Sequence, residues 1–290
     1  LLMANTQAAV WMIGAIISFT SMAIAGRAVS GLLDTFEIML YRSIIGFFVV
    51  LILARFLGTY REISLKDIKL HVFRNIFHFA GQNLWFFAVI YIPLSQLFAF
   101  EFSVPIWVAV LAPMFLKEKL TLVRFLSIAI GFVGILIVAR PNFSALDPAI
   151  ISAALCAIGF AVTSIATKEL TNTETITCIL FWLTLMQFSF GLICAGVDGE
   201  IDFPKGFELI WITIIGFCGL IAHFCITKAL SLAPALVVSP LEFLRLPFIS
   251  IIGYFMYNEN LEILVFLGAI LVLFANLINI RNEIKIKKEV

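Results

Sequence analysis

The sequence predicts an all-α integral membrane protein whose ten transmembrane helices form two inverted five-helix repeats. Three observations support this prediction: a strongly apolar composition, ten apolar segments of helical length, and landmarks of the first half that recur in the second. Of the 290 residues, 62% are hydrophobic and 13% are charged, whereas soluble domains carry about 25% charged residues. The mean hydropathy is +1.11. In water such a chain would expose large apolar patches, so the bilayer is its expected solvent.

The apolar segments follow one another with short connections. Each approaches the roughly 20 apolar residues that a spanning helix needs, and none alternates with the two-residue period of a membrane β-strand. The ten segments use up the chain and leave no room for a soluble domain. The predicted helices cover residues 7–29, 34–56, 71–91, 94–116, 121–139, 148–168, 175–196, 207–229, 234–257 and 261–281.

Lysine and arginine are distributed unequally between the two predicted membrane faces. With the N-terminus in the cytoplasm, 14 of the 19 basic residues, Arg74 among them, flank the cytoplasmic face and 3 flank the opposite face. Arg42 and Arg245 remain inside the membrane. Cytoplasmic loops are enriched in these residues. We therefore expect both termini to be cytoplasmic, in a bacterial inner membrane, with residues 282–290 as a basic cytoplasmic tail.

The two halves share landmarks at a constant offset of 141 residues. The matching pairs are Arg27 and Lys168, Ala88 and Ala229, Pro93 and Pro234, Glu101-Phe102 and Glu242-Phe243, Glu118 and Glu259, and Leu120 and Leu261. Several matches in the same order indicate duplication of a five-helix unit, over residues 7–141 and 148–281. Because five is odd, the second copy enters the membrane in the opposite orientation. Inverted repeats are typical of secondary transporters, whose solute site lies near the membrane midplane between the halves.

Short motifs in both halves resemble those of a known family. In the first half they are WFFAVIYIPL at 85–94, FEFSVPI at 100–106, LKEKL at 116–120, GFVG at 131–134 and ARP at 139–141. In the second half they are KAL at 228–230, Pro234, PLEFLRL at 240–246 and NEN at 258–260. With these motifs the chain resembles the EamA-type family of the drug/metabolite transporter superfamily over nearly its whole length. Its last predicted helix departs from the pattern, because only Gly268 remains of the GFVG sequence.

This resemblance implies a central cavity lined mainly by the third, fourth, eighth and ninth helices, with contributions from the first, second, sixth and seventh. The fifth and tenth helices are expected at the periphery. The family moves amino acids, metabolites and toxic organic compounds, often by coupling to protons or by exchange. The expected partners are therefore a small-molecule solute, with a proton as one candidate for the coupling ion, and the lipid bilayer. The resemblance is compatible with both a monomer and a homodimer.

Prolines gather in two predicted helices that the repeat makes equivalent. Six of the nine lie in, or at the head of, the fourth and ninth helices: Pro93, Pro105, Pro113, Pro234, Pro240 and Pro247. Proline removes a backbone donor and interrupts a helix, and matching interruptions in two halves indicate a transporter's solute site. The alternative is that the kinks only shape the bundle.

Four charged residues lie well away from the ends of the predicted transmembrane helices: Glu101, Glu242, Arg245 and Arg42. A charge at mid-helix costs roughly 2.5–3.5 kcal/mol on insertion scales, so a functional role is expected. Glu242 and Arg245 share a helix face, and a structural ion pair is the rival interpretation. Position 104, the counterpart of Arg245, is valine. We therefore expect Glu101 to be the freer carboxylate, which titrates a proton or binds an amine, with Arg42 as an alternative neutralising partner. On this view Glu101→Gln abolishes transport and leaves folding intact.

The third predicted helix carries a polar and aromatic stripe. Asn75, His78, Gln82 and Trp85 are spaced by 3, 4 and 3 residues, which places them on one helix face. His223 is the repeat partner of Gln82. We expect His78, Gln82, Trp85 and His223 to line the cavity, whereas hydrogen bonding between helices is the alternative, favoured for Asn75.

These observations favour a secondary carrier that moves a small polar organic solute, such as an amino acid or related metabolite, by alternating access. An exporter of lipophilic cations is the alternative, because carboxylates and 30 phenylalanines suit a cation. A membrane-embedded enzyme is disfavoured, since neither GxSxG nor HExxH occurs. The five cysteines form no metal-binding spacing and no basic tract is interleaved with aromatics, so we expect no metal, no cofactor and no nucleic-acid partner.

Overall fold

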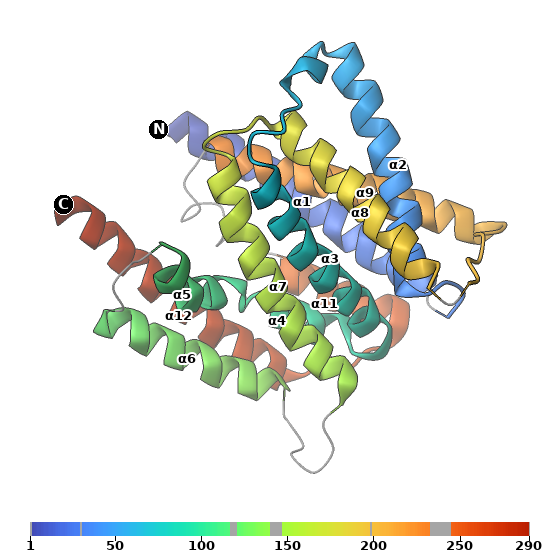
Figure 1. Ribbon diagram of the computed structural model, residues 1–290. Helices are drawn as coiled ribbons and strands as arrows, with labels where there is room; N and C mark the ends of the chain where they lie inside the picture. Colours follow the sequence, from blue (N-terminus) through green and yellow to red (C-terminus); the bar gives the residue numbers. More distant parts are fainter. Residues whose placement is uncertain are drawn as a thin grey trace.

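The computed structural model describes residues 2–29, 31–116, 121–139, 147–197, 199–232 and 245–289, and all its elements there are α-helices apart from one short 3-10 helix (Figure 1). The all-α class is therefore confirmed. The elements are α1 (Leu2–Ala28), α2 (Thr35–Phe56), η1 (Thr59–Glu62), α3 (Ile68–Tyr91), α4 (Leu94–Glu101), α5 (Val104–Leu116), α6 (Leu122–Ala139), α7 (Pro148–Leu170), α8 (Ile176–Ala195), α9 (Phe207–Leu232), α11 (Arg245–Tyr257) and α12 (Ile263–Glu289).

Six spans in the described part of the chain are long and apolar enough to cross a membrane. They lie in α1, α2, α4 with the start of α5, α7, α8 and α9, and shorter apolar stretches lie in α6, α11 and α12. Each of the ten predicted segments contains a described helix. The predicted helix over 94–116 is divided into two, and the last helix continues to Glu289 rather than ending near 281.

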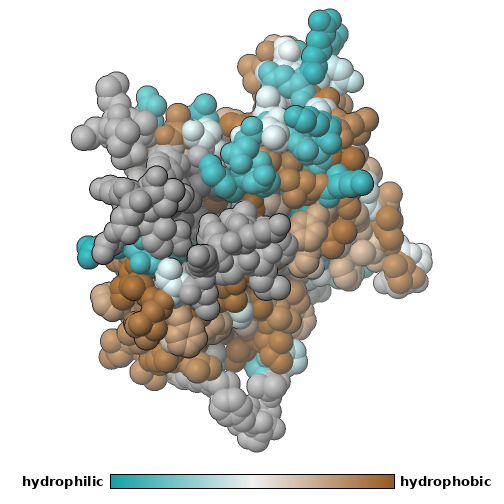
Figure 2. Space-filling view, turned by 60° about the vertical axis from the view of Figure 1, so that its left-hand side comes forward, coloured by the Kyte–Doolittle hydropathy of each residue, from teal (hydrophilic) through white to brown (hydrophobic). Residues whose placement is uncertain are grey.

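The flanks of the molecule are strongly apolar. Phe56, Phe207, Phe255 and Ile263 each expose at least 75% of their surface. Figure 2 shows hydrophobic side chains over the lower left and right-hand parts of the coloured surface, and most of the hydrophilic ones in its upper part. A surface of this kind suits contact with lipid rather than with water.

Helices of the first half pack against helices of the second half in a regular pattern. α2 packs on α8 and α6 packs on α12, and the members of each pair begin 141 residues apart in the sequence. α1 packs on α9 while α3 packs on α7, so the first and third helices of the two halves exchange partners. A two-fold relation between two similar halves produces this pattern of contacts.

The segment that joins α4 to α5 is interrupted beside an ionisable residue. Pro105 has no N–H to donate to the carbonyl of Glu101, four residues earlier, so the α-helical ladder is broken there. The turn is held instead by Ser103, whose N–H and hydroxyl both donate to the carbonyl of Phe100, at 3.0 and 2.6 Å. The interruption in the first half therefore agrees with the prediction, while Pro234 and Pro240 lie outside the described residues.

The two peripheral helices, α6 and α12, approach closely through glycines. A Cβ on Gly134 would lie 2.7 Å from the carbonyl oxygen of Gly268, and a Cβ on Gly268 would lie 2.6 Å from the carbonyl oxygen of Gly134. Neither position can hold a larger residue unless the helices separate. The glycine that the last helix retains therefore lies against a glycine of the GFVG sequence.

Candidate functional site

A cavity of about 140 Å³ lies between the two halves of the chain. Its walls come from α1, α3, α7 and α9, with further side chains from α4, α5 and α11. Six of the eight predicted site residues line it: His78, Gln82, Trp85, Glu101, His223 and Arg245. Side chains from distant parts of the sequence are thus brought to one cavity.

The predicted stripe on α3 forms one wall of this cavity. His78, Gln82 and Trp85 are each at most 2% exposed and all line it. Asn75 is also buried but takes another role, because its amide donates to the carbonyl of His71 and it accepts a hydrogen bond from Gln187 of α8. Asn75 therefore joins two helices, which is the alternative that the sequence favoured for it.

An ion pair across the two halves lies at one end of the cavity. The Arg245 guanidinium on α11 donates from Nη2 to Oε2 of Glu101 on α4 at 2.8 Å, and the two side chains are 6% and 10% exposed. The indole N–H of Trp85 donates to the other carboxylate oxygen of Glu101. The expectation that Glu101 is the freer carboxylate is therefore wrong, because its partner comes from a different helix.

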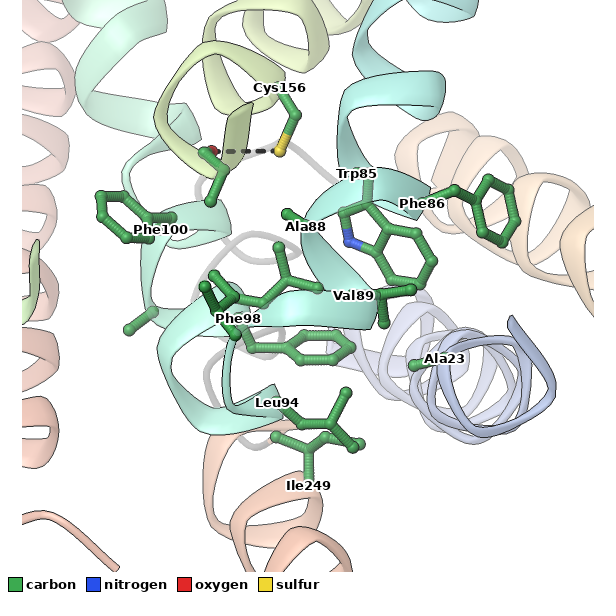
Figure 3. Packing of buried hydrophobic residues seen from close by; sticks show 14 of the residues in the cluster. Ala23, Trp85, Phe86, Ala88, Val89, Leu94, Phe98, Phe100, Cys156 and Ile249 are labelled. Carbon is green, nitrogen blue, oxygen red and sulfur yellow. Dashed lines mark hydrogen bonds between the residues drawn. The ribbon is translucent and has the colours of Figure 1, made fainter. Parts of the chain in front are cut away.

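Aromatic rings surround this ion pair. The Arg245 guanidinium carbon lies 4.6 Å from the ring centroid of Phe98 and 5.2 Å from that of Phe19. The rings of Trp85 and Phe98 meet edge to face, and Figure 3 shows both among the packed apolar side chains of α3 and α4. Cation–π contact in a desolvated place stabilises a guanidinium by about 2 kcal/mol.

Two histidines from opposite halves meet in the cavity. The rings of His78 and His223 lie 4.8 Å apart and nearly perpendicular. Both ring nitrogens of His78, and Nε2 of His223, are buried with no hydrogen-bond partner. Buried polar groups without partners are uncommon in folded proteins and call for an explanation such as a ligand or water.

Sequence reasoning missed Arg74, which also lines the cavity. It was counted among the basic residues that flank the cytoplasmic face, yet it lies inside α3 and is 2% exposed. The signal was present, since Arg74 is four residues before His78 and thus extends the same stripe. Its Nε donates to the Thr167 hydroxyl of α7 at 2.6 Å.

The other two predicted site residues are placed differently. Arg42 is buried but lies beside a second, water-sized cavity of about 10 Å³, which it shares with His223. The Arg42 guanidinium approaches the Met39 sulfur at 3.8 Å and does not pair with Glu101. Glu242 lies outside the described residues, so the predicted Glu242–Arg245 pair stays a prediction.

A hydrogen-bonded network lies beyond the cavity at its Trp85 end. Arg27, at the end of α1, forms an ion pair with Glu259, between α11 and α12, and donates to the carbonyl of Val89 at 2.8 Å. Glu259 also accepts a hydrogen bond from the backbone N–H of Leu94 at 2.9 Å. The ends of α1, α3 and α4 are thereby joined to the second half, which agrees with an anchoring role for Glu259.

Three potential metal ligands meet away from the cavity. Ligand atoms of His71, Glu174 and Cys178 lie within 4.8 Å of one another, where α3 and α8 begin. The Cys178 thiol lies 3.4 Å from the backbone nitrogen of Ser64 and 4.0 Å from Nε2 of His71. Structural zinc sites use four ligands. Spacing along the sequence could not reveal this group, because His71 lies about 100 residues before Glu174 and Cys178.

Comparison with known proteins identifies the family. The model of the EamA-like transporter family matches residues 6–140 and 147–281. The S-adenosylmethionine uptake transporter of Rickettsia felis is 26% identical over 277 residues, which is 95% of this chain and 92% of that protein. The riboflavin transporter of Brucella anthropi is 28% identical over 228 residues, 77% of this chain and 80% of that protein.

A solved crystal structure shares the fold. It has a TM-score of 0.64 and 14% identity and covers 94% of this chain and 96% of its own. The two family matches together span nearly all of the sequence, and the resemblance that the motifs indicated is confirmed. The chain belongs to the EamA-like transporter family.

Proposed function

We propose that this protein is a secondary transporter that moves a small organic metabolite across a bacterial inner membrane by alternating access. The observation that carries the proposal is the cavity between the two matched halves, because it combines an ion pair with buried imidazoles that lack partners. The transporter family and two relatives named for small metabolites support it.

The proposed architecture is ten transmembrane helices in two inverted repeats, over residues 7–141 and 148–281, with both termini in the cytoplasm. The exchange of partners between α1, α3, α7 and α9 supports the repeat relation. The bias of lysine and arginine supports the orientation. An odd number of helices in each repeat requires the second repeat to be inverted.

Each of the six predicted residues that line the cavity has a proposed role in the solute path. Glu101 and Arg245 offer both charge signs to a polar solute, and Trp85 fixes the carboxylate by its hydrogen bond. His78 and His223 offer ring nitrogens as hydrogen-bonding groups. Gln82, the fourth residue after His78 on α3, adds an amide to the same wall.

Alternating access requires one end of the cavity to close while the other opens. The Arg27–Glu259 network suits the closed end, because it joins the two halves beyond the cavity. Pockets for drug-sized ligands measure about 300–1,000 Å³, whereas this cavity measures about 140 Å³. A solute as large as a nucleoside derivative therefore requires the surrounding helices to separate further.

Export of lipophilic cations receives less support from the described side chains. Arg74 and Arg245 bring two positive charges to the cavity wall, and Glu101, the one carboxylate among the described lining residues, is paired. A lipophilic cation without an anionic group would meet a wall with an excess of positive charge, which disfavours its binding.

A thermal-shift screen of the purified protein tests the proposal. A solute that binds only the folded state stabilises it by mass action. At a concentration 100 times its Kd it raises the free energy of unfolding by about 2.7 kcal/mol, and the unfolding temperature rises with it. The panel contains S-adenosylmethionine, riboflavin, amino acids and quaternary ammonium dyes. We expect stabilisation by a metabolite and none by the dyes, and stabilisation by the dyes alone would overturn the proposal in favour of cation export.

A further inference from the structure

Arg74 is a buried guanidinium whose charge no carboxylate balances among the residues the structure describes. It is 2% exposed, and its two described hydrogen bonds go to neutral acceptors, the Thr167 hydroxyl at 2.6 Å and the Asn75 amide oxygen at 3.2 Å. Arginine does not lose its proton in proteins. A buried charge without a partner is costly, so an anion in the cavity would relieve this cost.

The donors of Arg74 suit such an anion. A guanidinium has five N–H groups in a planar fork, and the two described bonds use one at Nε and one at Nη1. The neighbouring Thr167 hydroxyl donates its own hydrogen to the carbonyl of Thr163. The remaining N–H groups of Arg74 are therefore available as donors at this end, and a carboxylate can accept two of them side by side.

The Glu101–Arg245 pair lies too far along the cavity to provide the missing charge. Arg74 precedes Trp85 by 11 residues on α3, and a rise of 1.5 Å per residue separates their levels by about 16 Å. Trp85 marks the level of Glu101, to which it donates its indole N–H. The two ends of the cavity therefore differ in charge. One end has a cation without a counter-charge, and the other has a neutralised ion pair.

His78 lies one helical turn from Arg74, between these two ends. Its two ring nitrogens are buried without partners, and its ring lies 6.1 Å from that of Phe160 on α7. Polar and aromatic groups therefore lie one helical turn from Arg74, beside the place where an anion would bind it. They suit the body of an elongated solute.

We propose that the transported solute is an elongated metabolite with a terminal carboxylate that binds Arg74, an inference that rests on the proposed transport function. One unpaired guanidinium balances one carboxylate, whereas a phosphate dianion would bring an excess of negative charge. Of the two solutes named for relatives, S-adenosylmethionine has a carboxylate and riboflavin has none. The inference therefore favours the first class.

Matched solute pairs that differ only in the carboxylate test this inference. The pairs are S-adenosylmethionine and decarboxylated S-adenosylmethionine, arginine and agmatine, and lysine and cadaverine. Binding to the full-length protein is measured by thermal shift, and competition by counterflow in proteoliposomes. We expect the acid of at least one pair to bind roughly 10- to 100-fold more tightly than its amine, as for charge-assisted hydrogen bonds.

Two variants separate binding from a structural role. In Arg74→Gln the preference for the acid should fall to near unity, while the unfolding temperature without solute stays equal to the wild type or rises, because a buried unpaired charge is gone. The control Arg55→Gln removes an exposed arginine of α2 and should keep the preference. A large loss of stability in Arg74→Gln without solute contradicts the inference, because it assigns Arg74 to the fold.

The outcomes also separate this inference from the proposed function. If in every pair that binds the amine binds as tightly as its acid, or if riboflavin alone binds, the carboxylate inference is wrong while metabolite transport stands. If no member of the panel binds or exchanges, metabolite transport itself is contradicted, and the inference with it.

Discussion

Replacement of Glu101 by glutamine isolates the charge of the buried ion pair. The glutamine side chain has nearly the same shape and keeps an oxygen that can accept the indole N–H of Trp85. The substitution removes the negative charge that pairs with Arg245, whose side chain is 6% exposed. The guanidinium cannot become neutral, so the variant retains a buried cation without a counter-charge.

The structure sets the size of the effect. Breaking a buried ion pair by removing one partner costs about 3–5 kcal/mol. The cation–π contacts of Arg245 with Phe19 and Phe98 remain in the variant, so we expect the lower end, about 3 kcal/mol. At roughly 2–4 °C per kcal/mol for a chain of this size class, the unfolding temperature in one detergent should fall by about 6–12 °C. This replaces the expectation that Glu101→Gln leaves folding intact.

The reverse substitution is the matched comparison. Arg245→Gln leaves a carboxyl group that can take up a proton and keep its bond to Trp85, so we expect a smaller loss, about 1–2 kcal/mol. The double variant should be more stable than Glu101→Gln, because neither charge is left alone. Equal unfolding temperatures for the wild type and Glu101→Gln, or a less stable Arg245→Gln, would refute this reasoning.

Three further substitutions test other parts of the account. Arg27→Gln removes the ion pair with Glu259, so peptides at the end of α3 and the start of α4 should exchange hydrogen for deuterium faster; unchanged exchange argues against closure there. Gly134→Val places Cβ 2.7 Å from the Gly268 carbonyl oxygen, and we expect a loss of at least about 1–3 kcal/mol in thermal unfolding, which a wild-type melting temperature contradicts. Trp85→Phe keeps a ring but removes the indole donor, so it should lower the free energy of unfolding by about 1.5–3 kcal/mol and slow solute uptake. Wild-type stability together with wild-type uptake would show that this hydrogen bond has no role.

Helix positions were readable from the sequence because membrane helices need about 20 apolar residues. The starts of α2 and α8, at Thr35 and Ile176, and those of α6 and α12, at Leu122 and Ile263, also repeat the predicted offset of 141 residues. The break between α4 and α5 followed from Pro105, since its missing donor has a local effect.

The charge pairing was not readable from the sequence. Glu101 and Arg245 are 144 residues apart, and the predicted neighbour for Arg245 was Glu242 in its own helix. Only the packing of α4 on α11 brings the observed partners together. Local spacing describes contacts within a helix, whereas contacts between helices depend on their relative rotation.

Arg74 shows a second limit of sequence reasoning. Lysine and arginine near a predicted helix end are normally counted as flanking charges. Arg74 was therefore assigned to the cytoplasmic flank, although it lies on the same helix face as His78. The residue could have been found by extending the spacing of the stripe toward the start of the helix. Its hydrogen bond to Thr167 could not, because α7 lies about 90 residues away in the sequence.

Uptake into proteoliposomes tests most directly whether the central cavity carries a metabolite. Radiolabelled S-adenosylmethionine and riboflavin are offered to vesicles with the wild type, with His78→Phe, or without protein. His78→Phe keeps a ring and removes two buried nitrogens that lack partners. We predict saturable uptake of at least one solute by the wild type and a loss of at least about tenfold in His78→Phe, with no fall in its unfolding temperature. Uptake by the folded wild type equal to that of protein-free vesicles for both solutes, or wild-type uptake by His78→Phe, would contradict the account.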